Sequence, residues 1–416
     1  MKAFKGHRPF AVLVILLFCA SLASISAVKL TLTSPKDKTI TEATTLMVNG
    51  QLDGAKSITI NGMKINPTGR NLEAMAILNP GKNLMNIDVT GTGGDRVSKS
   101  LRVIRVIAFD DLKQLFGLRE HWAKKQVIAL ATLGIIEGYA DNNFKPEDPM
   151  TRGEFATWLA RAKGLKLAKP SKDLYFDVPK EHWRAPFIKA VVDAGIMGGT
   201  SQNVFGIETP LKRSEAVRIM AKAYNIAAAG AVSSPFSDVN SDTTNSKAII
   251  SAYKSGLVVG TSRWKRSFDP ERDIKRAEAA VLISRLGKIK TMIAALYDFS
   301  QGFSSLNLCR INTRPIIKKA FITPKEVINN GANNVKVSLY VMDEQGRGDI
   351  SQVWADLTDL GGPLNAKMNV QKDFSYGLSF SVSGEAKPGQ KKVNIYAMDR
   401  SGLKANTVLN LNILGK

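Results

Sequence analysis

Two parts of the chain alternate apolar and polar residues, and a long middle part does not. Near the start, Met85, Ile87 and Val89 are separated by polar residues, which is the pattern of a strand with one buried face. Near the end, the same alternation runs through residues 335–341 and 393–397. A period of two therefore predicts antiparallel β-structure at both ends of the chain.

Turn residues divide these regions into short strands. Asn61-Gly62 separates two short apolar runs, which predicts a hairpin with a two-residue turn. We therefore expect an immunoglobulin-like β-sandwich at residues 28–106 and a second one at 315–416. Residues 291–314 are expected to be a connector with some helical character.

In the middle part, the apolar spacing becomes helical. Val127, Leu130 and Ala131 share one helix face, and Gly134 follows as a C-cap glycine would. A second helix is expected to begin at Thr151-Arg-Gly-Glu154, where the hydroxyl and carboxylate form a capping-box pattern. The unit is thus helix, loop, helix.

This unit occurs three times. Gly134, Gly195 and Gly256 lie 61 residues apart, and Arg152 and Arg213 do so as well, with Arg276 following after 63. One helical hairpin cannot bury its apolar face alone, whereas three in series can. The repeats are expected at about 108–168, 169–230 and 231–290.

The first 27 residues have the features of an export signal. Lys2, Lys5 and Arg8 precede an apolar run at 11–20, and small residues follow up to Ala27. A retained anchor is the alternative, but the run is short for a bilayer span, and no later segment approaches the ~20 apolar residues that a span requires. We expect a signal peptide at 1–27 and an exported mature chain.

The cysteine content limits the possible disulfides, and the charge indicates which partners the chain favours. Without the signal, only Cys309 remains, so an internal disulfide is excluded. The chain has 58 Lys and Arg against 36 Asp and Glu, and loss of the signal's three cations lowers the formal charge from +22 to +19. Such an excess favours anionic partners, whether acidic glycans, lipid headgroups or nucleic acid.

The order of motifs resembles the S-layer homology module. Phe-x-Asp-Val, His-Trp, Gly-Ile-Ile-x-Gly-Tyr, Phe-x-Pro and Thr-Arg-x-Glu follow one another, and the resemblance covers residues 108–290. It implies a pseudo-threefold helical bundle whose grooves hold a pyruvylated secondary cell-wall polysaccharide attached to peptidoglycan. The expected fold class is multidomain α plus β, with the bundle between two immunoglobulin-like sandwiches.

The resemblance also points to arginines in the grooves. A pyruvyl ketal adds a carboxylate to a sugar, and the planar guanidinium can donate two parallel hydrogen bonds to it. Arg152, Arg213 and Arg276 occupy the motif position at which the family places its ligand-binding arginine. The expected alternative for such a residue is a solvated or internally paired arginine.

Carboxylates near these arginines are secondary candidates. Asp177 and Asp238 stand at equivalent places and are expected to orient a guanidinium or to bond sugar hydroxyls. Repeat one offers Asp110 or Asp111 in their place. The glutamates of the capping-box position are interpreted instead as helix-start residues: Glu154, Glu215 and Glu278.

Two tryptophans and one loop complete the predicted site. Trp122 and Trp183 are candidates for packing against a sugar ring, although a tryptophan at the start of a repeated helix is more often a core residue. Thr244 stands at that position in repeat three. Gly138 and Tyr139 of the Gly-Tyr motif are included as ligand-binding candidates.

No catalytic constellation is evident in the sequence. His121 and His182 are the only histidines after the signal, and they occupy equivalent places in two repeats, which indicates a structural role. Asp343, Glu344 and Asp349 have oxygen ligands suited to calcium, but acidic turn residues are usually only solvated. We expect no metal, no cofactor and no enzyme activity.

The predicted function is therefore that of a non-catalytic cell-envelope protein. It would lie at the cell wall, the cell surface or the periplasmic face of the envelope, anchored to the wall polysaccharide, with no nucleic acid partner. The alternative is an adhesin or accessory carbohydrate-binding protein whose C-terminal sandwich, 315–416, binds an external ligand.

Overall fold

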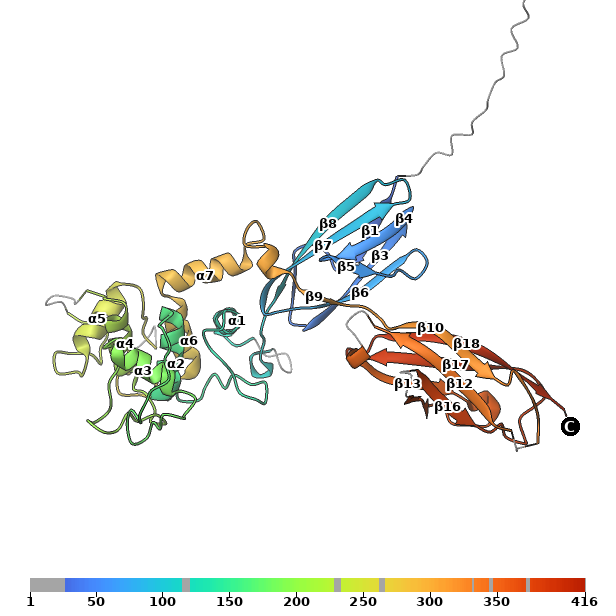
Figure 1. Ribbon diagram of the computed structural model, residues 1–416. Coiled ribbons are helices and arrows are strands. Elements are labelled where there is room, and N and C mark those ends of the chain that lie inside the picture. The colour runs from blue at the N-terminus through green and yellow to red at the C-terminus, as the bar shows by residue number, and fades with distance from the viewer. Residues whose placement is uncertain are drawn as a thin grey trace, which may run out of the picture.

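The computed structural model describes residues 27–113, 120–227, 233–261, 266–330, 333–343, 347–371 and 375–415. They form two β-rich regions and a helical region between them in the chain (Figure 1). This is the predicted multidomain α plus β class. The predicted signal peptide, apart from Ala27, lies outside the described residues.

The first sandwich has eight strands from the N-terminal part of the chain. Asn61 and Gly62 both have positive φ, 51° and 81°, in the turn between β4 and β5, so the predicted two-residue hairpin turn is confirmed. The strands are β1 (Lys29–Ser34), β2 (Thr39–Thr41), β3 (Thr45–Asp53), β4 (Ala55–Ile60), β5 (Met63–Ile65), β6 (Asn71–Ile77), β7 (Gly81–Gly91) and β8 (Arg96–Arg105). They form two sheets, in the orders β1-β3-β6-β9 and β2-β8-β7-β4-β5.

One strand of this sandwich comes from much later in the chain. β9 (Arg310–Asn312) pairs antiparallel with β6, and Cys309 and Ile311 lie in the first sandwich's core. The predicted division gives these residues to the connector, because a three-residue strand is too short to show alternation. Burial raises the pKa of the Cys309 thiol to about 11, as expected of a structural cysteine.

The second sandwich follows β9 directly. Its two sheets have the orders β10-β12-β16-β15 and β11-β18-β17-β13-β14, and their inner faces form a separate apolar core. The strands are β10 (Ile316–Thr323), β11 (Glu326–Ile328), β12 (Val335–Met342), β13 (Ile350–Asp356), β14 (Ala366–Lys367), β15 (Asn369–Val370), β16 (Tyr376–Phe380), β17 (Gly389–Asp399) and β18 (Lys404–Leu414).

The helical region contains two helices per repeat and one extra helix. They are α1 (Lys124–Thr132), α2 (Arg152–Lys163), α3 (Ala185–Asp193), α4 (Arg213–Ala223), α5 (Ser246–Lys254), α6 (Arg276–Ser284) and α7 (Gly287–Tyr297). Short 3-10 turns occur at Asp110–Leu112, Ser305–Asn307, Arg347–Asp349 and Thr358–Leu360. None of the helices in the described part of the chain combines the length and apolarity needed to cross a bilayer.

The predicted helix ends are present. Gly134, Gly195 and Gly256 have φ of 70°, 66° and 73°, the left-handed conformation of a C-cap glycine. Thr151 accepts the Glu154 N–H while the Glu154 carboxylate accepts the Thr151 N–H, which completes the capping box of α2.

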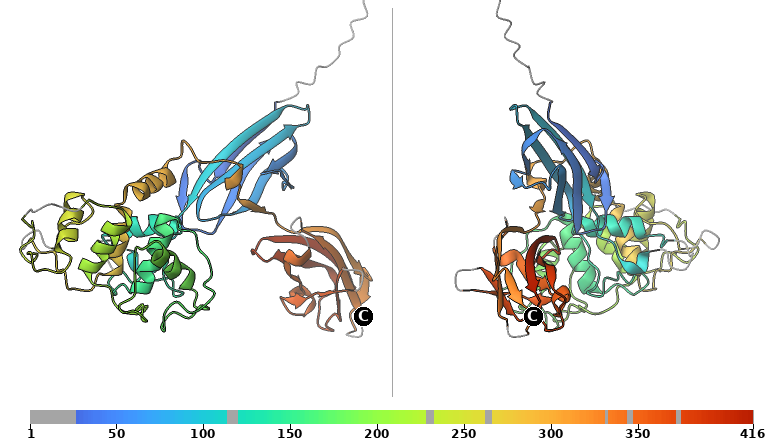
Figure 2. Two further views of the ribbon diagram at one scale, coloured as in Figure 1. Left: turned by 60° about the vertical axis from the view of Figure 1, so that its left-hand side comes forward. Right: turned by 90° about the vertical axis from the view of Figure 1, so that its right-hand side faces the viewer.

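The second helix of each repeat packs on the first helix of the next one. α2 packs on α3, α4 packs on α5, and α6 packs back on α1. We call these contacts the first, second and third seam. A single apolar core runs through all three repeats. In Figures 1 and 2, α7 lies between these helices and the first sandwich.

Three backbone hydrogen bonds close the ring of repeats. The Leu211 N–H donates to the Met150 carbonyl at 2.8 Å, Ile274 donates to Leu211 at 2.9 Å, and Met150 donates to Ile274 at 2.8 Å. These residues immediately precede the second helices, at equivalent places. Each repeat therefore depends on both of the others, and the expected pseudo-threefold bundle is the observed one.

The glycine of the Gly-Tyr motif is required by close packing. A Cβ atom on Gly138 would lie 2.7 Å from the Asn143 carbonyl oxygen and would overlap the Phe109 ring. Gly138→Ala should therefore lower the free energy of unfolding by about 1–3 kcal/mol, the usual effect of overpacking. Gly198→Ala is the matched control, because nothing lies within 4 Å of a Cβ there. Urea unfolding followed by the helical circular dichroism signal measures both, and equal stabilities would contradict this account.

Candidate functional site

Each second helix begins with an arginine that reaches into the following repeat. Arg152, Arg213 and Arg276 are only 3%, 5% and 2% exposed. A charged group is almost never buried to this degree unless it is paired and hydrogen-bonded. Their contacts account for the burial.

Arg276 shows the full pattern. Its Nε donates to the Phe144 carbonyl at 2.9 Å and its Nη2 to the Glu137 carbonyl at 2.9 Å. Its Nη1 donates to Glu154 Oε1 at 2.7 Å. All three acceptors belong to repeat one, so this side chain joins the last repeat to the first.

Arg152 makes the same contacts with repeat two. Its Nε donates to the Phe205 carbonyl at 2.9 Å, its Nη2 to the Gly198 carbonyl at 2.6 Å, and its Nη1 pairs with Glu215. The Arg152 guanidinium thus contacts loop carbonyls and the first turn of the second helix in repeat two.

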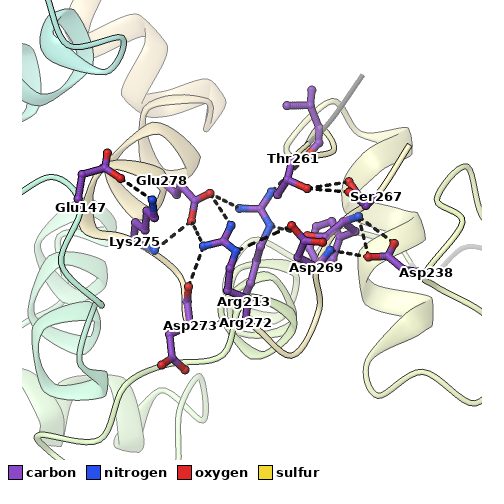
Figure 3. A network of polar contacts seen from close by, with 12 residues as sticks. Glu147, Arg213, Asp238, Thr261, Ser267, Asp269, Arg272, Asp273, Lys275 and Glu278 are labelled. Atoms are coloured by element: carbon purple, nitrogen blue, oxygen red, sulfur yellow. Dashed lines mark hydrogen bonds and ion pairs between the residues drawn. The ribbon is translucent and has the colours of Figure 1, made fainter. Parts of the chain in front are cut away.

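Arg213 of repeat two makes the corresponding contacts with repeat three, and Figure 3 shows it beside Glu278. Its Nε donates to Phe268 O at 2.9 Å and its Nη2 to Val259 O at 3.1 Å. Glu278 lies 3.5 Å from Arg213 and also accepts a bidentate pair from Arg272 at 2.8 and 3.2 Å. Glu278 is therefore shared by two cations.

The structure gives these arginines an internal role in place of the predicted open one. Each of the three uses Nε and both terminal nitrogens within the bundle and is almost fully buried, so little of the guanidinium is accessible to a ligand carboxylate. The glutamates interpreted as helix-start residues have a second task, because Glu154, Glu215 and Glu278 are the partners of these arginines.

Burial and ion pairing shift the pKa values of the charged groups in this network. Burial lowers the pKa of Arg213 and of Arg276, yet both remain charged because arginine starts far above neutrality. Burial alone would raise the pKa of Glu278, but the Arg272 hydrogen bonds and the charge of Arg213 outweigh it, and the pKa is lowered.

The predicted aspartates anchor loops. Asp177 accepts the backbone N–H groups of residues 205–207 at 2.7–2.8 Å, and Asp238 accepts those of 268 and 269 at 2.7–3.1 Å. Asp111 does the same for Phe144 and the residue after it, so it is the counterpart in repeat one. The carboxylates predicted to contact a guanidinium or a sugar are used on backbone donors.

Tyr139 lies at the edge of this network. Its hydroxyl donates to Glu154 Oε1 at 3.0 Å, and its ring lies 4.7 Å from the Arg276 guanidinium carbon. The side chain is 39% exposed. Tyr139 therefore connects the buried ring of charges to the surface, whereas Gly138 has the packing role described above.

The two tryptophans of the His-Trp motif are exposed. Trp122 is 59% and Trp183 53% exposed, whereas Trp158 in the core is fully buried. The interpretation of Trp122 and Trp183 as core residues is therefore wrong. The imidazole before each of them accepts the backbone N–H two residues further on, at 3.2 Å for His121 and 3.1 Å for His182.

Arg184 is a site residue that the sequence did not reveal. Its guanidinium lies 4.4 Å over the Trp183 ring and only within 3.9 Å of Glu154 and 3.8 Å of Glu208. Among the described residues, its buried Nε has no hydrogen-bond partner. Its counterparts are Ala123 and Asn245, so comparison of the repeats gave no signal.

Three acidic residues gather in the second sandwich. Carboxylate oxygens of Asp343, Asp349 and Asp399 lie within 4.8 Å of one another, although the sequence presents the first two as solvated turn residues. Asp399 is buried and accepts a hydrogen bond from Asn312 at 2.8 Å. Glu344 lies outside the described residues. The cluster joins β9 to the second sandwich.

Comparison with known proteins agrees with the geometry of the bundle. The model of the S-layer homology domain matches residues 118–156, 175–217 and 235–280. The Surface-layer 125 kDa protein of Lysinibacillus sphaericus is 31% identical over 166 residues, 39% of this chain and 14% of that protein. S-layer protein sap of Bacillus anthracis is 26% identical over 222 residues, 52% of this chain and 26% of that protein.

The match is not confined to surface-layer proteins. Amylopullulanase of Thermoanaerobacterium thermosulfurigenes is 30% identical over 183 residues, 42% of this chain and 10% of the enzyme. The chain thus matches about a quarter or less of the length of these three relatives.

The S-layer homology match and the surface-layer relatives indicate a modular protein of the cell surface. The matched residues coincide with the three repeats of the ring. The chain contains three tandem S-layer homology domains, with β-rich regions on either side.

Removing one arginine should open the ring. In Arg276→Met, Glu154 would remain buried without its main cation, and loss of one partner of a buried pair lowers stability by about 3–5 kcal/mol. Arg218→Met is the control, because its side chain is 44% exposed and surface changes stay within about 0.5 kcal/mol. Urea unfolding of the helical signal distinguishes them. If both variants unfolded like the unchanged protein, the arginines would not hold the ring.

Acid should weaken the second seam through Glu278. Its folded pKa lies below its ordinary value, so its stabilising effect is complete above the unfolded pKa of about 4.3 and is lost as pH falls through the folded value. The stability difference between the unchanged protein and Glu278→Gln should therefore shrink as pH falls below about 4. Unfolding curves in a pH series measure it, and a difference that persists at the acid end would contradict the assignment.

Proposed function

We propose that this chain is a non-catalytic cell-envelope protein whose S-layer homology domains anchor it to an acidic, pyruvylated polysaccharide of the wall. The domains themselves indicate a cell-surface, wall-associated location.

The exposed pair of tryptophans carries the proposal. Trp122 and Trp183 occupy equivalent places in two repeats, and both are more than half exposed. A large aromatic side chain kept at the surface twice contributes nothing to the core, and such residues are typical of binding sites, where a flat apolar face packs against a ligand. A sugar ring offers a matching flat face of C–H groups.

Charge supports an acidic glycan. Arg184 lies over Trp183, and its ion pairs with Glu208 and Glu154 are long, at 3.8 and 3.9 Å. A guanidinium in this position can donate to a carboxylate beside a stacked sugar. The formal charge, +22 for the full sequence and +19 without the signal's three cations, adds long-range attraction.

The histidines do not suggest catalysis. His121 and His182 each accept a backbone N–H through Nδ1, which fixes the ring at a helix start. The carboxylates of the bundle's ring are paired with arginines. Binding thus agrees better with these side chains than bond cleavage does.

A second candidate function concerns the C-terminal sandwich. Trp354 of β13 and Tyr396 of β17 stack at 5.2 Å between ring centres, with Lys404 over the Trp354 ring at 5.6 Å. Beside them lies a concavity of about 500 Å³. An aromatic pair beside a hollow favours the adhesin or accessory carbohydrate-binding alternative for this domain.

The test is co-sedimentation with purified wall material. We expect the double variant Trp122→Ala, Trp183→Ala to lose at least about tenfold in affinity, since each stacking contact contributes on the order of 1 kcal/mol. Its helical signal should be unchanged because neither indole is in the core. Arg184→Gln should weaken binding to pyruvylated wall more than to wall stripped of pyruvate.

Phe176→Ala is the matched control. Phe176 is an aromatic residue of repeat two that is 82% exposed and does not belong to the His-Trp motif. It should sediment like the unchanged protein. Undiminished sedimentation of the double variant would refute the role of the tryptophans, and equal binding to stripped wall would refute recognition of the acidic group.

A further inference from the structure

Each of the two sandwiches contains a sheet with the same strand arrangement. In the first sandwich the order is β2-β8-β7-β4-β5, and in the second it is β11-β18-β17-β13-β14 (Figure 1). In both sheets the first of these strands is parallel to its neighbour, whereas the other pairs are antiparallel. β4 therefore corresponds to β13, β7 to β17 and β8 to β18, and rows of side chains that cross the outer face occupy comparable places in the two sheets.

The outer face of the first sandwich has a polar row. Thr59, Asp88 and Ser98 stand opposite one another on β4, β7 and β8. The Ser98 hydroxyl donates to Asp88 at 2.6 Å, and Ser100 donates in the same way to Asn86 at 2.8 Å. Short polar side chains that bond across the strands are expected of a sheet face in contact with water.

The comparable face of the second sandwich has large side chains instead. Trp354, Tyr396 and Asn406 stand opposite one another on β13, β17 and β18, and Lys367 of β14 stands on the other side of Trp354. Val353 precedes Trp354 in the strand and lies in the core, so the indole belongs to the outer face. Two stacked aromatic side chains kept out of the core are typical of a binding surface.

The hollow of about 500 Å³ beside this row is positively charged. Lys367 and Lys404 line it, and the Lys404 Nζ lies 5.6 Å from the Trp354 ring centre. None of the described residues that line the hollow is acidic, and neither lysine forms an ion pair with a described carboxylate. Asp356 is on the same face, but its carboxylate accepts the N–H and the hydroxyl of Thr358. Two ammonium groups beside one indole repel each other, and a bound anion would offset that repulsion.

Two amides complete the walls of the hollow. Gln352 and Asn365 line it and are exposed. An amide offers donors and an acceptor, as sugar hydroxyls require. A neutral sugar would use the indole and the amides but leave both lysines without a counter-ion. A phosphate ion or a peptide carboxylate would pair with the lysines but leave the indole uncovered. A sugar ring that bears a carboxylate uses all three kinds of group.

We propose that this face of the second sandwich binds a uronic acid residue of an acidic polysaccharide. Its carboxylate pairs with Lys367 and Lys404, and its ring packs on Trp354. Gln352 and Asn365 bond its hydroxyl groups. This inference rests on the candidate carbohydrate-binding function of the C-terminal sandwich and names the ligand class of that site. The site lies outside the helical repeats, so its ligand is bound independently of the wall.

The probes are trimers of galacturonic, glucuronic and mannuronic acid, each titrated calorimetrically into the full chain beside its methyl ester. The ester keeps the rings and most hydroxyls but has no charge, so it isolates the contribution of the carboxylate. We expect at least one acid trimer to bind and its ester to bind at least about tenfold more weakly, because charge-assisted hydrogen bonds are lost. Absence of binding by all three acid trimers would overturn the inference.

Lys404→Gln should weaken binding of the acid trimer about tenfold and leave binding of the ester unchanged. Lys404 is exposed, so this variant keeps the fold. Trp354→Ala should weaken binding of both, because each loses the aromatic face. Lys392→Gln is the matched control, since Lys392 is an exposed lysine of β17 outside the hollow. It should bind like the unchanged protein, and an equal loss in Lys392→Gln and Lys404→Gln would refute the assignment.

The outcomes separate this inference from both proposed functions. Equal binding of acid and ester that depends on Trp354 would refute the acidic class and leave carbohydrate binding by the sandwich in place. The double variant Trp122→Ala, Trp183→Ala should still bind the acid trimer, and Trp354→Ala should still sediment with wall. Loss of the trimer in the double variant alone would place its binding at the bundle and refute this site. Failure of the unchanged protein to sediment would refute only the wall anchoring.

Discussion

The bundle depends on three arginines that each cross into the neighbouring repeat. Every one of them satisfies two loop carbonyls and one glutamate of the next repeat, and Arg276 returns the series to its start. Because a buried guanidinium and a buried carboxylate are each unfavourable alone, no repeat is complete without its neighbours. The three domains therefore form one folding unit with one core, and their order in the chain becomes a ring in space.

The sequence predicted those features that rest on local chemistry. Period-two alternation, the Asn61-Gly62 turn, the C-cap glycines and the Thr151 capping box all concern residues close together in the chain, and the structure has each of them. The threefold repeat was readable for the same reason, since equivalent local motifs recur at a fixed spacing.

The sequence could not predict which side chains contact one another across the seams between repeats. Motif position suggested open arginines, but their glutamate partners lie one repeat away and look like ordinary helix-start residues. Trp122 resembles a core tryptophan in the sequence, but its side chain is exposed. Arg184 is a departure from the repeat pattern, and comparison of the repeats therefore does not reveal it.

The return of the chain to β9 has a mechanical consequence. Since β9 pairs with β6, the bundle is an insertion within the first sandwich, entered after β8 and left before β9. Tension applied through the second sandwich is borne first by the β6–β9 hydrogen bonds and the first sandwich. The helical bundle joins the first sandwich at both of its ends, so separation of β9 from β6 would leave it attached in the chain to that sandwich through β8 alone.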